Sequence, residues 1–144
     1  MKRADTQQLI RSWWSAFNEK DLDRFASYLA EDLNVENLYG MRLDSRAEFE
    51  DYLQPLFAMS TDARIAVEHT IVEGEHAAAE LHMRATHDGA SVYGVEPSGK
   101  AIELRWTIHV ELAESKVKRI KIFSNPLTIL EQLGLSEGLP SIRP

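Results

Sequence analysis

The sequence has no cysteine and no long hydrophobic run, and each absence excludes a class of site or location. Without cysteine the chain cannot form a disulfide, a thiolate metal site or a thiol nucleophile. No window approaches the roughly 20 apolar residues of a membrane span. The charged amino terminus, MKRADTQQLI, is not followed by an apolar run of signal-peptide length. We therefore expect a soluble protein with a cytoplasmic location.

Basic side chains are scarce as well. The 144 residues include 16 basic and 23 acidic side chains, which gives a net charge of -7. A negative surface repels phosphate backbones and anionic lipid, so neither nucleic acid nor a membrane is an expected partner. With 44% hydrophobic residues, a chain of this length can bury one core. Because no linker or repeat divides it, the sequence predicts a single domain over residues 1–144.

Helical periodicity dominates the first part of the chain. The apolar residues of a first helix share one face: Leu9, Ile10, Trp13, Trp14 and Phe17. Asp5 or Thr6 can cap this helix, and Asp21 can cap a short second one. Ser45 followed by Glu48 forms a capping box, which predicts a third helix.

Two prolines set further helix boundaries. We expect the third helix to bend or end near Pro55, because proline removes a helical hydrogen bond. Asn125 and Pro126 supply the cap and first turn of a short last helix, which Gly134 ends.

From residue 64 onward the hydrophobic period changes to two. The pattern predicts consecutive antiparallel strands over 64–73, 77–87, 100–113 and 116–124, after an earlier short strand over 33–39. Residues 88–99 form a longer loop, which we expect at a pocket rim. Helices followed by an antiparallel meander are typical of an α+β domain whose helices cover one face of the sheet.

Strand alternation predicts which side chains face the helices. In the segment 100–113 the apolar row is Ile102, Leu104, Trp106, Ile108 and Val110. The same rule turns Met83 and Ile122 inward, together with three polar residues, Asn37, Tyr39 and His69. The opposite face is polar and of mixed charge, with Glu80, His82, Arg84, Glu103, Arg105, His109 and Glu111, and Lys121 and Phe123 nearby. That face is either solvated or a dimer interface.

Several short motifs resemble those of a known family. They are Thr86-His87-Asp88-Gly89, Gly94-Val95-Glu96-Pro97-Ser98-Gly99-Lys100, Lys116-Val117 and Leu130-Glu131-Gln132-Leu133-Gly134. In order and spacing they resemble the SnoaL-like polyketide and ester cyclases of the nuclear transport factor 2-like superfamily. The run Ala16-Phe17-Asn18-Glu19-Lys20-Asp21-Leu22-Asp23 resembles ketosteroid isomerase, which belongs to the same superfamily.

The resemblance implies a fold and an assembly. We expect a cone-shaped, cystatin-like α+β domain, with three amino-terminal helices packed on a curved, mainly antiparallel sheet and a short carboxy-terminal helix. It also implies a homodimer formed through the outer sheet face.

The chain departs from its relatives where they carry out proton transfer. The acid and base of the cyclases occupy the strand positions that match Ile108 and Ile122, and isoleucine cannot move a proton. In the isomerase comparison the general base falls on Asn37 and the hydroxyl donor on Trp13.

The inward residues form a candidate ligand site that is mostly apolar, as small-molecule pockets are. The predicted ligand contacts are Trp13, Trp14, Phe17, Asn37, Tyr39, Met83, Leu104, Trp106, Ile108 and Ile122. His69 and His87 are candidate catalytic residues, because histidine titrates near neutral pH. The histidine spacing fits no metal site, and we expect neither a metal nor another cofactor.

Three functions fit this pattern. The first is a SnoaL-like domain that binds a small hydrophobic, cyclic ligand without the chemistry of the cyclases. The second is a cyclase-type or isomerase-type enzyme that uses His69 with Asn37 and Tyr39. The third is a homodimeric structural module with a vestigial pocket.

Overall fold

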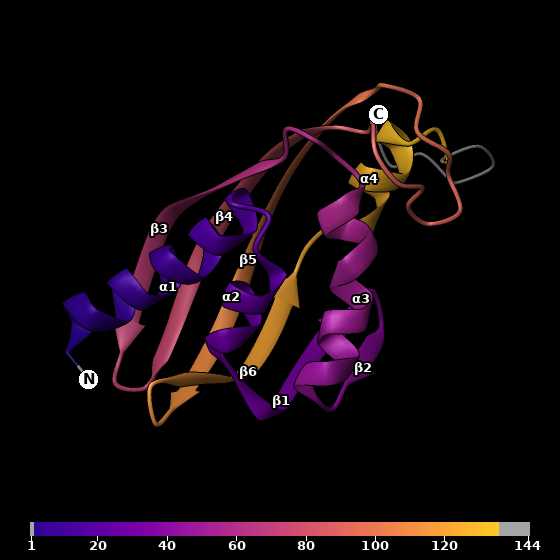
Figure 1. Cartoon of the computed structure of the whole chain (residues 1–144). Coiled ribbons are helices and arrows are strands. Elements are labelled where there is room, and N and C mark those ends of the chain that lie inside the picture. Colours follow the sequence, from indigo (N-terminus) through magenta and orange to yellow (C-terminus); the bar gives the residue numbers. More distant parts are fainter. Residues whose placement is uncertain (1, 136–144) are drawn as a thin grey trace, which may run out of the picture.

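The computed structural model describes residues 2–135, which form one six-stranded sheet with four helices (Figure 1). The helices are α1 (Arg3–Asn18), α2 (Leu22–Ser27), α3 (Arg46–Ala58) and α4 (Pro126–Gln132). The strands are β1 (Leu29–Leu38), β2 (Met41–Leu43), β3 (Arg64–Glu73), β4 (His76–Thr86), β5 (Ala101–Ala113) and β6 (Lys116–Phe123). Helices α1, α2 and α3 lie on the same side of the sheet, and α4 lies at one end of it (Figure 1). The predicted α+β fold is confirmed.

The sheet has the strand order β2-β1-β6-β5-β4-β3. Strands β3 to β6 form the predicted antiparallel meander, whereas β1 runs parallel to β6. Strand β1 begins four residues earlier than expected, at Leu29 instead of residue 33, and the short hairpin partner β2 was not predicted. The sheet is therefore mainly antiparallel, with one parallel pair.

Three of the four helices start where the sequence predicts. The side chain of Asp21 accepts a hydrogen bond from the amide of Arg24 at 2.9 Å, and Ser45 accepts one from the amide of Glu48 at 3.1 Å. Asn125 caps α4 in the same way. Such caps satisfy amides that have no partner within the helix.

The predicted cap of the first helix was wrong. Helix α1 starts at Arg3 with no side-chain cap, and Thr6, one of the two predicted caps, is already a buried helical residue. Helix α3, which the sequence predicted to bend or end near Pro55, contains this proline and ends three residues later, at Ala58. Burial of Phe57 and Met59 beyond the proline stabilises this last turn.

Two side-chain amides fasten helices to the sheet. Asn18, at the end of α1, exchanges two hydrogen bonds with the backbone of Ile65, at 2.9 and 2.7 Å. Gln132, in α4, does the same with the backbone of Glu103, at 2.8 and 2.7 Å. Both amides belong to the motifs that carry the family resemblance, so those residues position α1 and α4 against the sheet.

Two further predictions concern membrane spans and the number of domains. In residues 2–135 no helix is both long and apolar enough to cross a membrane. The predicted single domain over 1–144 includes residues 1 and 136–144, which lie outside the described residues, and the domain assignment stays a prediction.

Candidate functional site

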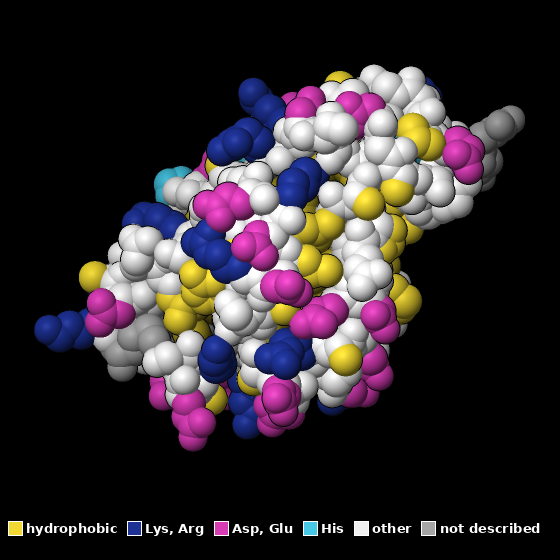
Figure 2. Space-filling view, in the orientation of Figure 1, with side chains coloured by type: hydrophobic (Ala, Val, Ile, Leu, Met, Phe, Trp, Pro, Cys, Tyr) yellow, Lys and Arg dark blue, Asp and Glu magenta, His cyan; other side chains and the backbone are white. Residues whose placement is uncertain are grey.

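A cavity lies between the helices and the inner face of the sheet. Its free volume is about 130 Å³. Its wall consists of Trp14, Phe17, Leu38, Tyr39, Phe49, Tyr52, Leu53, Leu56, Met59, Ile65, Met83, Tyr93, Leu104, Arg105, Trp106, Ile122, Ser124, Asn125, Thr128 and Ile129. In Figure 2 hydrophobic side chains are visible at the surface between α2 and α3, with acidic and basic side chains around them. The wall is thus built from α1, α3, α4 and the inner strand rows.

Aromatic rings form one side of the cavity. Trp14 meets Trp106 edge to face, with ring centroids 6.1 Å apart, and Phe17 lies 6.5 Å from Trp14. Trp13 is not part of the wall: it is fully buried, with its ring centroid 4.8 Å from that of Trp14. Trp13 therefore supports the aromatic wall from the core.

Three tyrosines bring hydroxyl groups to the rim. Tyr39 follows β1, Tyr52 comes from α3, and Tyr93 comes from the loop between β4 and β5. The hydroxyls of Tyr52 and Tyr93 are hydrogen-bonded at 3.0 Å, and the ring of Tyr39 meets that of Tyr93 edge-on at 6.1 Å. Burial raises the pKa of all three phenols above the ordinary value of 10.0, which keeps them protonated at neutral pH.

A tight turn presents Tyr93 to the cavity. Val92 and Val95 exchange two backbone hydrogen bonds, and Tyr93 and Gly94 between them have φ angles of 50° and 76°. Positive φ at both central residues is the geometry of a type I′ hairpin turn, for which glycine is well suited. Val92 is buried and anchors the turn. Sequence reasoning placed this loop at a rim but named neither Tyr93 nor Tyr52 as a site residue.

The segment that leads into this loop is fastened to the end of α3. Asp88 accepts hydrogen bonds from the amide and hydroxyl of Thr61, at 2.8 and 2.7 Å. The amide of Gly89 donates to the carbonyl of Met59. A Cβ atom at Gly89 would lie 2.1 Å from the carbonyl oxygen of Ala58, a separation that no side chain can adopt. Glycine is therefore required here by close backbone approach.

His87, a predicted catalytic residue, lies in the same segment, next to Asp88. It is fully buried, and its Nε2 donates to the carbonyl of Ala90 at 2.9 Å. Its backbone amide donates to the carbonyl of Lys100. The ring does not line the cavity, so its position favours a structural role.

The predicted inward orientation of His69, the other catalytic candidate, was wrong. Val67 pairs with Leu81 and His69 with the adjacent Glu80, so Glu68 is an extra residue in β3. Such a β-bulge reverses the alternation beyond it. His69 is consequently exposed on the outer face, away from the cavity.

The same kind of irregularity explains why Asn37 does not face the cavity as predicted. The register of β1 shifts between Val35 and Leu38, and Asn37 has a φ of 65°. Asparagine tolerates this left-handed conformation better than most residues. The buried Leu38 takes the inner place, whereas Asn37 is exposed and donates to the carbonyl of Ile122 at 2.7 Å. An enzyme that uses His69 with Asn37 and Tyr39 is therefore not compatible with the geometry.

The remaining predicted ligand contacts lie around the cavity or directly beneath it. Six of them line the cavity together with Tyr39: Trp14, Phe17, Met83, Leu104, Trp106 and Ile122. Ile108 lies directly opposite Ile122 in the β5–β6 ladder but is 1% exposed and belongs to the core beneath the cavity. Whether any of these residues contacts a ligand stays a prediction.

Carboxylate, imidazole and amine side chains are missing from the wall formed by the described residues. No Asp, Glu, His or Lys is among the lining residues, all of which belong to the described part of the chain. The charged group in the wall, Arg105, has a 63% exposed side chain and forms an ion pair with Glu68 on the outer face at 2.7 Å. The cavity can pack an apolar molecule and offer hydroxyl groups, but it holds no carboxylate or imidazole.

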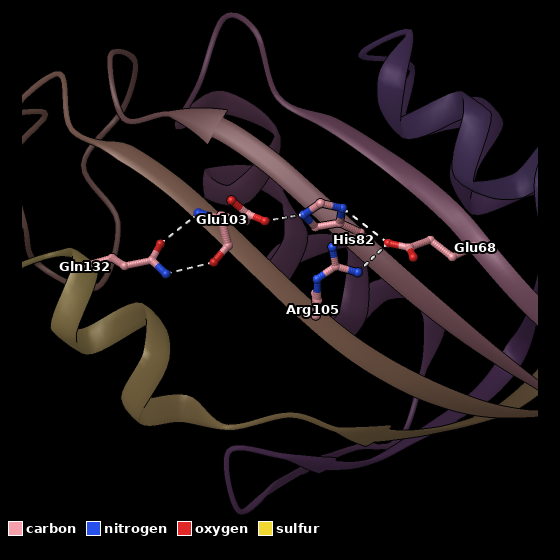
Figure 3. A network of polar contacts seen from close by, with 5 residues as sticks. All are labelled: Glu68, His82, Glu103, Arg105 and Gln132. Carbon is pink, nitrogen blue, oxygen red and sulfur yellow. Dashed lines mark hydrogen bonds and ion pairs between the residues drawn. The ribbon is translucent and has the colours of Figure 1, made fainter. Parts of the chain in front are cut away.

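The outer face, in contrast, carries a dense polar network (Figure 3). His82 lies between two carboxylates, with Nδ1 3.2 Å from Glu68 and Nε2 2.8 Å from Glu103. The hydrogen bond to His82 holds the pKa of Glu103 below its usual value. This network joins β3, β4 and β5 and, through Gln132, the last helix. Among residues 2–135 no group of three or more His, Asp or Glu side chains is arranged to hold a metal ion.

Comparison with known proteins gives a family and several similar structures. A family model described as SnoaL-like domain matches residues 10–120. AclR, a candidate hydroxylase from Streptomyces galilaeus, is 19% identical with a TM-score of 0.85, over 98% of this chain and 88% of that one. IdmH, a candidate polyketide cyclase from Streptomyces antibioticus, is 23% identical with a TM-score of 0.73, over 89% of this chain and 97% of that one.

A candidate polyketide cyclase from Xanthomonas campestris is 22% identical with a TM-score of 0.76, over 91% of this chain and 98% of that one. No curated protein matches the sequence. At these identities the similar structures establish the fold, and the family model establishes the family.

Proposed function

The chain belongs to the SnoaL-like domain family, and from this premise we propose that it binds a small, uncharged, ring-containing hydrophobic molecule and does not catalyse the proton transfers of the related cyclases. One observation carries the proposal: the cavity wall is apolar and aromatic and includes no Asp, Glu, His or Lys among the described residues. Pockets of this composition bind through burial of apolar surface, with a few polar groups to orient the ligand.

The size of the cavity supports a ligand of about one ring. An apolar cavity of roughly 150 Å³ takes up benzene, and the free volume here is about 130 Å³. Trp14 and Trp106, edge to face at 6.1 Å, provide ring surfaces for packing against a planar or cyclic molecule. A larger ligand requires the rim loop or the wall side chains to move.

The absence of proton-transfer groups argues against cyclase chemistry. A general base works best when its pKa lies near the operating pH. The phenols of the wall have pKa values raised above 10.0 by burial, and Arg105 is paired with Glu68. Ile108 and Ile122, which the family resemblance matches to the acid and base of the cyclases, pair with each other across β5 and β6.

Binding of toluene to the purified protein tests this proposal, measured by changes in tryptophan fluorescence or in NMR spectra. The wild type should bind saturably, and Ile122→Trp, which fills the cavity, should abolish binding. Phe123→Trp adds an indole to the next residue of the chain, which is 47% exposed on the outer face, and should bind as the wild type does. Equal loss in both variants, or no binding in the wild type, would contradict the proposal.

We also propose that the outer sheet face pairs with a second copy of the chain. The face carries charges of both signs on neighbouring strands, such as Glu80, Arg84 and Glu111, and a two-fold axis can bring opposite charges together. Phe123 is 47% exposed there and stacks edge-on against His109 at 5.2 Å. An exposed ring among self-complementary charges is typical of an interface centre.

A further inference from the structure

The tyrosine rim has a hydrogen-bonding capacity that the apolar cavity does not use. Its hydroxyls come from Tyr39, Tyr52 and Tyr93, which belong to three separate segments of the chain. The fold thus gathers three of its four tyrosines at one end of a cavity whose other walls are mostly hydrocarbon.

The number of phenolic hydrogens limits how many hydrogen bonds the rim can donate to a ligand. Each phenol has one hydrogen to donate. The Tyr52–Tyr93 bond, at 3.0 Å, uses one of two hydrogens, and either oxygen can be the donor. The hydroxyl of Tyr39 also interacts with that of Tyr93 and with Ser124, so the contacts among the three phenols use two of their three hydrogens. The third hydrogen remains for solvent or for an oxygen atom of a bound molecule. Because the donor and acceptor roles can be exchanged, it can be presented from Tyr52 or from Tyr39.

The charges around the rim favour a neutral oxygen over an anion. A bound carboxylate or phosphate needs a cation, and the cation in the wall, Arg105, is already paired with Glu68 at 2.7 Å. The three phenols remain protonated at neutral pH because burial raises their pKa. They therefore act as neutral donors, which suit a carbonyl, ether or hydroxyl oxygen.

We propose that the hydroxyls of Tyr39, Tyr52 and Tyr93 bind an oxygen atom of the ligand, so that the cavity selects ring compounds that carry a carbonyl or hydroxyl group at one end. This inference rests on the proposed function, since it assumes that the ring of the ligand occupies the apolar part of the cavity. The oxygen then lies at the rim, where Tyr39 and Tyr93 are 37% and 40% exposed.

A pair of probes of equal shape tests the inference. Cyclohexanone and methylenecyclohexane differ only in the replacement of a carbonyl oxygen by a methylene group. Tyr52→Phe and Tyr93→Phe should each weaken binding of cyclohexanone about fivefold, the factor expected for one neutral hydrogen bond. Binding of methylenecyclohexane should change by less than about twofold, because the phenylalanine ring preserves the apolar wall.

Two further variants keep the test decisive. Tyr28→Phe removes the hydroxyl of the fourth tyrosine, which is not in the wall, and should leave both affinities unchanged. Tyr39→Phe does not break the Tyr52–Tyr93 bond, so it tests recognition even if loss of that bond loosens the loop.

The possible outcomes separate this inference from the proposed function. If both probes bind and the phenylalanine variants weaken them equally, the tyrosines only hold the loop and the inference is wrong, while the proposed function stands. If neither probe binds the wild-type protein, the proposed function fails and the inference fails with it. A selective loss of cyclohexanone supports both.

Discussion

The two faces of the sheet differ in the chemistry that they can perform. On the inner face, Ile108 and Ile122 stand opposite each other beside a cavity that has no carboxylate or imidazole among the described residues. On the outer face of the same sheet, His82 lies within 3.2 Å of two carboxylates. The carboxylates and the imidazole of this network are thus separated from the cavity by the thickness of one sheet. The same sheet therefore supplies an apolar wall on one side and a charged surface on the other.

We expect the largest effect when a charged side chain is introduced on the inner face of the sheet. Ile108→Glu places a carboxylate at a position that is 1% exposed, and we expect a loss of about 3–5 kcal/mol in the free energy of unfolding, as for an unpaired buried charge. The loss should be smaller at acidic pH, where the buried carboxyl is protonated. Thr107→Glu, the adjacent outer-face change, should have little effect. Urea unfolding at pH 4 and pH 7 measures both, and equal losses would show that the faces do not differ as described.

A glycine substitution tests how the rim is held on the cavity side. Gly89→Ala should lower the free energy of unfolding by about 2–3 kcal/mol, since its Cβ would overlap the carbonyl of Ala58, which lies 2.1 Å away. At Gly94 a Cβ meets nothing within 4 Å and only the positive φ opposes alanine, so Gly94→Ala should cost about 1 kcal/mol. Thermal unfolding of the two variants compares a steric cost with a conformational one. A smaller effect at Gly89 than at Gly94 would contradict the close approach.

Acid should weaken the contact between Asp88 and Thr61, which fastens the rim loop to the end of α3. Hydrogen bonds from Thr61 hold the pKa of Asp88 below its ordinary value of 3.8. Stability from a lowered carboxyl pKa is fully present above the unfolded pKa and is lost as the pH falls through the folded one. Asp88→Asn should therefore be less stable than the wild type at pH 7, and the difference should shrink below about pH 4.

Asp51→Asn is the matched control for this experiment. Asp51 is exposed on α3 and makes no ion pair or side-chain hydrogen bond with any described residue. Its replacement should leave the pH dependence of urea unfolding as in the wild type. A difference between Asp88→Asn and the wild type that stays constant with pH would show that Asp88 does not stabilise the fold as a carboxylate.

The smallest effect on the folded chain is expected at the outer face. Phe123→Ser should leave the free energy of unfolding of each protomer nearly unchanged, because the ring is 47% exposed. It should shift the assembly from dimer toward monomer in sedimentation experiments over a range of concentrations. Met41→Ser, at an equally exposed residue of β2, should not. A wild-type protein that is monomeric at every concentration would remove the proposed interface.

Much of the fold could be predicted where strands are regular. In β5 the alternation from Ile102 to Val110 has no interruption, so the face of every residue followed from its neighbours. The caps at Asp21, Ser45 and Asn125 could also be predicted, since such side chains commonly accept a hydrogen bond from a free amide in the first turn of a helix.

The candidate site was harder to predict because it depends on irregularities. The extra residue Glu68 and the left-handed Asn37 each reverse the faces of their strands, and neither leaves a clear signal in the hydrophobic pattern. Tyr52 and Tyr93 are 41 residues apart in sequence, and only the docking of the loop on α3 brings their hydroxyls together.

The dissociation constant of toluene between pH 5 and pH 9 tests the central claim most directly. Because the described residues bring no carboxylate or imidazole to its wall, the cavity should bind toluene saturably, with a constant that is the same throughout this range. Failure to bind, or a change of about tenfold in affinity across a single titration, which linkage ties to an ionisable group affected by the ligand, would contradict the account.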